Sequence, residues 1–258
     1  MKVAYISDIH IEFMLNTMAE KLGKTVSVAA LAALFCKRLS EQECDFAVLA
    51  GDIGHCTERN IEFLNEADKL TDKKIFVCLG NHDYWDWGRE SRRGRGRSIE
   101  DLEKIYEEQI ARTKNIELLV AGKTVSMGNL IIIGDCAFAG YNKDFNAANG
   151  IYRDTLISPI AERALSNRWR EFYNATLKEA AAEGKKVLAV THMSVEEWGG
   201  SINPDILYIS GHIHDCKHDE AHVTVTDNYK GDAANGYYAW DFNFKTLTIQ
   251  PEKQELKE

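Results

Sequence analysis

Several features that would mark particular protein classes are missing from this chain of 258 residues. No Cys-x-x-Cys pair occurs among its six cysteines, and in a chain of this length they do not indicate a disulfide framework. We therefore expect reduced thiols in a cytoplasmic protein. The most apolar stretch, from Val26 to Cys36, is too short to cross a bilayer and predicts a buried helix. No secretory signal is visible, because a strand-like segment begins at Val3.

Positive charge is also scarce relative to negative charge. The formal net charge of −9 argues against a protein that coats nucleic acid or binds anionic membranes in general, although a local basic groove stays open. Linkers rich in proline or in glycine and serine are absent, and so are internal repeats. The sequence therefore predicts a single domain over residues 1–250, followed by a charged tail over 251–258.

Strands and helices alternate in the first half of the sequence. The predicted strands are short and apolar, as strands buried on both faces are, and cover Val3–Ile6, Phe46–Ala50 and Ile75–Leu79. The predicted helices cover Val26–Leu39, Asn60–Leu70 and Ile99–Thr113. This order favours a parallel sheet with right-handed crossovers, in which ligands bind at the carboxyl ends of the strands.

The second half of the sequence has a different pattern. Three closely spaced strands are predicted in tight hairpins over Ile116–Val120, Lys123–Ser126 and Leu130–Gly134. One long helix is predicted over Pro159–Glu183. The strands predicted after it cover Val187–Thr191, Ile206–Ser210, Ala221–Thr226, Tyr237–Asp241 and Thr246–Gln250. Two sheets packed face to face, with helices outside them, would account for this order.

Two polar segments, Tyr84–Ser98 and Ala139–Ser158, interrupt this scaffold and are long enough to be binding loops. We expect both to lie at the active site. The first contains five arginines, among them Arg89 and Arg92. Arginine suits bidentate phosphate contacts, so these two are candidate substrate-binding residues, and a solvated surface loop is the alternative.

Side chains of the kind that bind metals follow the predicted strands. Asp8-Ile9-His10 and His212-Ile213-His214 each pair two such side chains at a spacing that places both on the same side of an extended strand. The full set of candidate metal ligands is Asp8, His10, Asp52, Asn81, His192, His212 and His214. Seven donors exceed the needs of one ion and suit two ions that share a ligand. Asp52 is the natural bridge because it is central in the order.

The donor types restrict the metal and the chemistry. Mixed nitrogen and oxygen ligation without thiolates points away from a structural cysteine–zinc site. We expect two divalent metal ions, with Mn²⁺ ahead of Fe, Zn²⁺ and Co²⁺. Two ions about 3.5–4 Å apart clamp the attacking and leaving oxygens of an in-line displacement and lower the pKa of a bound water. Such a centre is suited to phosphoester hydrolysis.

The order Asp-x-His, Gly-Asp, Gly-Asn-His-Asp, His and Gly-His-x-His, from Asp8 to His214, resembles that of the calcineurin-like metallophosphoesterase superfamily. The resemblance implies an α/β fold, a four-layer αββα sandwich with two mixed β-sheets flanked by helices. It implies one metal held by Asp8, His10 and His214, a second held by Asn81, His192 and His212, and Asp52 between them.

The resemblance also implies a mechanism. A metal-bridging hydroxide attacks in line, while His82 stabilises the phosphoryl oxygens and protonates the leaving group. Asp83 orients His82 or supports the loop. Both are our candidate catalytic residues.

A departure from one branch of the superfamily, the protein phosphatases, narrows the range of expected substrates. Protein phosphatases continue Gly-Asp as Gly-Asp-x-x-Asp-Arg-Gly, whereas His55 and Cys56 occupy the Asp and Arg positions here. The chain looks closer to the small-substrate branch, which includes class III cyclic-nucleotide phosphodiesterases, and His55 is a further candidate substrate-binding residue. We expect a small phosphorylated or nucleotide substrate and neither a membrane nor an obligate protein partner. A nuclease or nucleic-acid phosphatase, and a non-catalytic metal-binding scaffold, are the alternatives.

Overall fold

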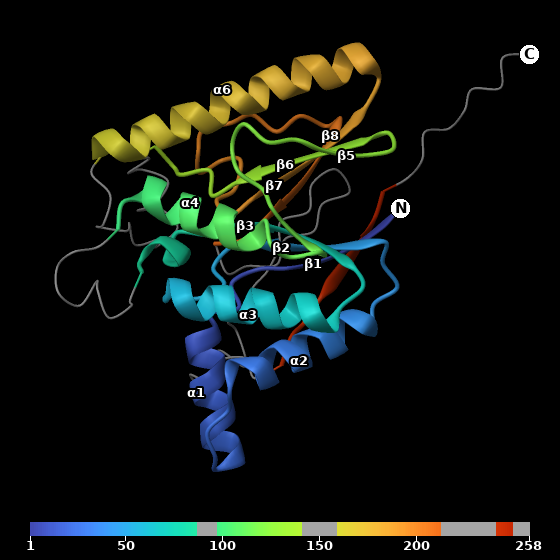
Figure 1. The fold of residues 1–258 in the computed structure, drawn as a ribbon. Helices are drawn as coiled ribbons and strands as arrows, with labels where there is room; N and C mark the ends of the chain where they lie inside the picture. The colour runs from blue at the N-terminus through green and yellow to red at the C-terminus, as the bar shows by residue number, and fades with distance from the viewer. Residues whose placement is uncertain (87–96, 141–158, 213–240, 250–258) are drawn as a thin grey trace, which may run out of the picture.

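The computed structural model describes residues 1–86, 97–140, 159–212 and 241–249. Two β-sheets lie face to face, and helices cover their outer faces (Figure 1). Helix α6 (Pro159–Glu183) runs along the second sheet, and α2 (Val28–Ser40) and α3 (Thr57–Leu70) lie on the opposite side of the molecule. The predicted α/β architecture of two mixed sheets flanked by helices is confirmed.

The first sheet has the strand order β4-β3-β2-β1-β9. These strands are β1 (Lys2–Ile6), β2 (Phe46–Ala50), β3 (Lys74–Cys78), β4 (Ile116–Leu118) and β9 (Lys245–Thr248). β1 to β4 are parallel to one another, and β9 is antiparallel to β1. Because the parallel strands all end at one edge, the loops that follow them meet there.

The second sheet has the order β5-β6-β7-β8. Its strands are β5 (Val125–Met127), β6 (Leu130–Asp135), β7 (Lys186–Thr191) and β8 (Ile206–Ser210). β5 and β6 form a hairpin, and β6, β7 and β8 are parallel. The prediction that the strand at Ile116 also joins a tight hairpin is wrong, because β4 pairs in parallel with β3 in the first sheet. The chain passes from the first sheet to the second after β4. The neighbouring strands β4 and β5 are therefore close in sequence but belong to different sheets.

Strand residues alternate between two apolar layers, as the period of two requires. Val3 and Tyr5 of β1 lie in the layer between the sheets, together with side chains from β2, β6, β7 and β8. Ala4 and Ile6 face the other way and pack with the residues of the covering helices. This packing on both faces explains why the strands are almost uniformly apolar.

The remaining helices are α1 (Ile11–Leu22), α4 (Ile99–Ile110) and the short 3₁₀ helix η1 (His82–Tyr84). α4 begins with a capping box in which Ser98 accepts from the Asp101 amide. The sequence pattern predicts no helix over the residues of α1. His10 precedes this helix without capping it through its side chain, so the usual start signal is missing.

Some predictions lie outside the described residues. They include the strand at Ala221–Thr226, all but the last residue of the strand at Tyr237–Asp241, and the tail over 251–258. The loop Tyr84–Ser98 is described at residues 84–86 and 97–98, and the loop Ala139–Ser158 at residues 139 and 140. The single domain stays a prediction.

Among the described helices, none is both long enough and apolar enough to span a membrane.

Candidate metal centre

The candidate ligands gather where the parallel strands of both sheets end. Asp8 follows β1, Asp52 follows β2 and Asn81 follows β3 in the first sheet, while His192 follows β7 and His212 follows β8 in the second. Each of these side chains is buried or nearly so. Donors that are far apart in the sequence therefore converge on one edge of the sandwich.

Backbone hydrogen bonds hold the converging loops together. The Asp8 amide donates to the Gly51 carbonyl at 3.0 Å, and the His10 amide donates to the Asp52 carbonyl at 3.0 Å. In the second sheet, the Gly211 amide donates to the His192 carbonyl at 2.9 Å. These bonds continue the strand pairing into the loops and fix the positions of the side chains that the loops carry.

Four of the candidate ligands have left-handed backbone conformations. The φ angles are 51° at Asp8, 41° at His10, 53° at Asp52 and 70° at His212. Non-glycine residues adopt such angles uncommonly, and at a cost that the surrounding structure must offset. Because four such residues lie together at one edge, we infer that the requirements of a site, and not core packing, set the backbone geometry there.

Three glycines make room for the ligands that lie against them. A Cβ on Gly80 would lie 2.2 Å from Asp52 Oδ1, and one on Gly211 would lie 2.6 Å from Asp8 Oδ2. A Cβ on Gly51 would lie 2.5 Å from His192 Nδ1. No side chain fits at any of these positions, so glycine is required for the backbone to approach the carboxylates and the imidazole this closely.

The donors form two groups that share one carboxylate. Asp8, His10 and Asp52 place ligand atoms within 4.8 Å of one another, and so do Asp52, His192 and His212. A carboxylate common to both groups can contact two ions at once. The arrangement fits two divalent metal ions of the type that accept mixed nitrogen and oxygen ligation.

A backbone carbonyl group orients the His192 ring for metal binding. Its Nδ1 lies 2.9 Å from the Ala50 carbonyl oxygen, which can only accept, so Nδ1 carries the hydrogen. Nε2 then faces Asn81 Oδ1 at 3.0 Å and Asp52 Oδ2 at 3.3 Å. A ring held in this way by a carbonyl presents the lone pair of its other nitrogen to a metal.

The buried carboxylates attract positive charge. Burial alone would raise the pKa of Asp52, but the neighbouring rings of His192, His82 and His10 outweigh burial and hold that pKa well below its usual range. Burial opposes a charge on His192, and Asp52 nevertheless raises the pKa of His192 to about 10. An environment that favours protons on a buried imidazole favours metal cations for the same electrostatic reason.

Asp8 and His212 connect the two sheets at the centre. The His212 amide donates to both carboxylate oxygens of Asp8, at 3.2 and 3.1 Å, and the Ser7 hydroxyl donates to Asp8 Oδ2. The β1 loop and the β8 loop are thereby joined, although 204 residues separate them.

Glu197 lies next to a candidate ligand, although the sequence pattern does not predict it as a site residue. Its Oε1 lies 3.4 Å from His212 Nε2, and its Oε2 accepts from the Ser194 amide at 2.7 Å. The side chain is 0% exposed, and burial raises its pKa to about 7. The only signal in the sequence is the pair Glu196-Glu197 shortly after His192, and nothing in that pair tells which member is buried.

His82 lies at the mouth of this group. Its side chain is 23% exposed, and its Nε2 lies 3.9 Å from Asp52 Oδ2. The His82 amide donates to Asp52 Oδ1 at 2.9 Å, and the ring packs on Trp85 with centroids 3.8 Å apart. The ring is therefore held close to the shared carboxylate while part of the side chain stays accessible to solvent.

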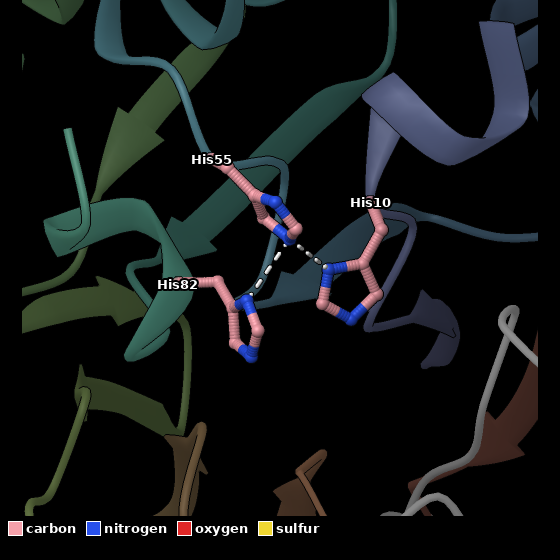
Figure 2. A group of neighbouring side chains, drawn as sticks. All are labelled: His10, His55 and His82. Atoms are coloured by element: carbon pink, nitrogen blue, oxygen red, sulfur yellow. Dashed lines mark hydrogen bonds between the residues drawn. The ribbon is translucent and has the colours of Figure 1, made fainter. Parts of the chain in front are cut away.

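His55 lies behind His82 and is 1% exposed. Its Nε2 is 2.9 Å from His82 Nδ1 and 3.2 Å from His10 Nδ1 (Figure 2). Burial, together with positive charge on His82 and His10, lowers the pKa of His55 to about 3. This burial favours a supporting role for His55 over direct contact with a substrate.

Asp83 forms hydrogen bonds that hold together the loops around the site. Its carboxylate accepts from the Gly80 amide at 2.7 Å, from the Gly54 amide at 3.1 Å and from Asn60 Nδ2 at 3.0 Å. The side chain is fully buried, and burial, followed by the charge of Asp52, raises its pKa well above the usual range. These bonds join the loops after β2 and β3 and do not involve the ring of His82.

Three of the predicted site residues lie outside the described part of the chain: His214, Arg89 and Arg92. Arg97, at the end of the same arginine-rich segment, is described. Its Nε donates to Asp86 Oδ2 at 2.7 Å, and its Nη2 donates to Glu58 at 2.9 Å. Arg97 is thus engaged by acidic side chains at the base of the segment.

A model of the calcineurin-like phosphoesterase family matches residues 1–216. No curated protein sequence matches the chain. Among solved structures, NAD nucleotidase of Haemophilus influenzae aligns with a TM-score of 0.45 and 15% identity over 88% of this chain, which spans only 42% of the nucleotidase. A dimetal phosphatase of Danio rerio aligns with a TM-score of 0.47 and 13% identity over 87% of each chain.

Proposed function

The chain belongs to the calcineurin-like phosphoesterase family, and from this membership we propose a two-metal phosphohydrolase that cleaves a small phosphomonoester or phosphodiester, nucleotide-type substrates included. The family establishes a metal-dependent phosphoesterase. Our proposal adds the number of ions, the residues that bind them and the class of substrate.

The observation that carries the proposal is the sharing of Asp52 by two groups of donors. Asp8 and His10 complete one group, and His192 and His212 complete the other. We assign one ion to the first group together with His214, and the second ion to the other group together with Asn81, whose Oδ1 faces His192 Nε2. The bound ions supply an activated water and neutralise charge on the phosphoryl oxygens.

His82 is assigned the role of proton donor to the leaving group. Among the described candidate residues it has the most exposed side chain, and its ring stands over Asp52 with Nε2 on the side of the shared carboxylate. A substrate phosphate placed between the two donor groups would therefore meet this ring edge. General acids positioned in this way contribute typically ~10²–10⁴-fold to the rate.

The substrate assignment rests on the residues that follow Asp52 in the sequence. His55 is buried, and Cys56 occupies the position where a protein phosphatase has an arginine. Without that arginine, phosphate contacts must come from elsewhere, and we assign them to Arg89 and Arg92 in the segment that begins just after His82. A small phosphorylated substrate, whose phosphate group can enter the metal centre, suits this arrangement.

The test uses chelated protein reloaded with Mn²⁺. We expect Mn²⁺-dependent hydrolysis of p-nitrophenyl phosphate or bis(p-nitrophenyl) phosphate, and of at least one member of a panel of nucleotides and cyclic nucleotides. Asp52→Asn should abolish it. Asp205→Asn is the matched control, because Asp205 is exposed and precedes β8 at the strand end opposite the site. Metal-loaded wild-type protein that is inert to the whole panel would contradict the proposal, and cleavage of oligonucleotides alone would favour a nuclease.

A further inference from the structure

His10 and His82 present the same edges to the same two neighbours. The Nε2 atoms lie 3.6 Å (His10) and 3.9 Å (His82) from Asp52 Oδ2. The Nδ1 atoms both face His55 Nε2, at 3.2 Å and 2.9 Å respectively (Figure 2). His55 therefore lies between a proposed metal ligand and the proposed general acid, and a single nitrogen of His55 contacts both.

Hydrogen counting restricts how these three rings can be protonated. A neutral imidazole carries one hydrogen, on either Nδ1 or Nε2. If His10 binds an ion through Nε2, its hydrogen must be on Nδ1, which then donates to His55 Nε2. His55 Nε2 is then an acceptor without a hydrogen of its own. His82 Nδ1, only 2.9 Å from the same nitrogen, must also carry a hydrogen, because two facing lone pairs would repel.

The surroundings of His55 keep the ring neutral and in place. It is 1% exposed, and the ring of Phe13 packs edge-on against it with centroids 5.0 Å apart. The His55 amide donates to Glu12 Oε2 at 2.9 Å, which fixes the backbone behind the ring. A buried ring beside two other imidazoles is a poor site for a positive charge and a suitable acceptor for their N–H groups.

The hydrogen on His82 Nδ1 determines what His82 can do. With that hydrogen in place, Nε2 exchanges a proton between the imidazolium and the neutral ring, as a general acid must. With the opposite tautomer, loss of the Nε2 proton would leave an anionic ring, which is not accessible near neutral pH. The tautomer is set by the partner of the other nitrogen.

We propose that His55 is a positioning residue that couples ion binding at His10 to the tautomer of His82, so that the acid is set for proton transfer when the centre is loaded. The catalytic consequence of this coupling rests on the proposed function. Its structural content, the tautomer of His82 in the loaded protein, is independent of activity.

The kinetic test compares two leaving groups in two variants. His55→Phe keeps a ring of similar size but removes the acceptor, and His55→Gln places an amide oxygen close to the position of Nε2. An alkyl phosphoester needs a proton from His82, whereas p-nitrophenolate leaves without one. We expect His55→Phe to slow alkyl ester hydrolysis by about 100-fold and p-nitrophenyl ester hydrolysis less than about 5-fold. His55→Gln should recover most of the loss.

Two further measurements separate positioning from general damage. In a His82→Ala background, His55→Phe should cause no additional loss on the alkyl ester, and the ion content of His55→Phe should equal that of the wild type. Equal losses on both leaving groups, or a His55→Gln variant that recovers nothing, would overturn the proposal.

The direct readout is ¹⁵N NMR of histidine-labelled wild-type protein loaded with Zn²⁺, which is diamagnetic. We expect neutral His82 to carry its hydrogen on Nδ1 after loading. A hydrogen on Nε2 in the loaded protein would overturn the coupling even if the enzyme is active. Wild-type protein inert to every substrate would instead contradict the proposed function, and the NMR result would still decide the coupling.

Discussion

The Nδ1 of His192 lies 2.9 Å from the carbonyl oxygen of Ala50, and this contact joins the end of β7 to the end of β2 across the two sheets. The carbonyl fixes the hydrogen on Nδ1 and leaves Nε2 for a cation. Gly51 follows Ala50 because any side chain there would collide with the same imidazole. The ligand geometry is therefore built into the backbone of both sheets.

Gly80 provides a steric test of the site. In Gly80→Ala the new Cβ would lie 2.2 Å from Asp52 Oδ1 and 2.4 Å from the Asp52 amide, so Asp52 must shift. We expect ion affinity to fall at least about 10-fold, and stability to fall by about 1–3 kcal/mol as in other overpacked sites. Titration with Mn²⁺ and urea unfolding measure the two effects.

Gly122→Ala is the control for that experiment. A Cβ at Gly122 meets nothing within 4 Å, although its φ of 99° makes alanine strained there. It should lower stability without changing ion affinity. Equal ion affinity in Gly80→Ala and Gly122→Ala would show that the close approach to Asp52 is unimportant.

Asp83 should contribute to stability more than to chemistry. Asp83→Ala removes the acceptor for the Gly80 and Gly54 amides and for Asn60, and leaves buried donors unsatisfied. We expect a loss of about 2–4 kcal/mol in the free energy of unfolding, with Asp83→Asn losing less because it keeps one acceptor. Urea unfolding gives the comparison. An Asp83→Ala protein of wild-type stability that lacks activity would instead assign Asp83 a direct catalytic role.

Glu197 should tune the affinity of the centre through His212. The carboxylate lies 3.4 Å from His212 Nε2, and partners of this kind are worth about 10–100-fold in metal affinity. Glu197→Ala should weaken the binding of one ion by that factor, and isothermal titration would resolve it. Glu196→Gln, an exposed neighbour, should bind as the wild type does. Unchanged affinity in Glu197→Ala would show that His212 needs no support from this side.

The pH dependence of stability should reflect the pair Arg38 and Asp241. Arg38 donates to both Asp241 oxygens, at 2.8 Å (Nε to Oδ1) and 2.6 Å (Nη2 to Oδ2), and this lowers the pKa of Asp241. A lowered folded-state pKa adds stability above the ordinary aspartate pKa, and the gain is lost as pH falls through the lowered value. Asp241→Asn should therefore reduce the melting temperature at pH ~7 and have little effect at pH ~2. A reduction of the same size at both pH values would rule out the ion pair as its cause.

The sequence was sufficient to predict the elements that carry the ligands. β8 and α6 have the predicted bounds, because a short apolar run and a long helix between a proline and a glycine are unambiguous patterns. The ligands follow strand ends, and parallel strands bring those ends together. The closeness of Asp8 and Asp52 could thus be expected from topology, whereas the approach of His212 from the second sheet was expected only from the family resemblance.

The sequence was insufficient where long-range packing decides. β4 pairs with β3 although β5 is nearer along the chain, because the chain changes sheets after β4. α1 begins directly after His10, whose left-handed backbone conformation is not among the sequence signals that mark a helix start. Glu197 and Glu196 look alike in sequence, and only the fold buries one of them.

The number of ions that Asp52 holds tests the account most directly. After chelation, Mn²⁺ should rebind to the wild-type protein at two ions per chain, and Asp52→Asn should weaken both binding events because both donor groups share this carboxylate. Saturation of the wild type at a single ion, or an Asp52→Asn protein that loses one site and keeps the other at full affinity, would contradict the two-metal centre.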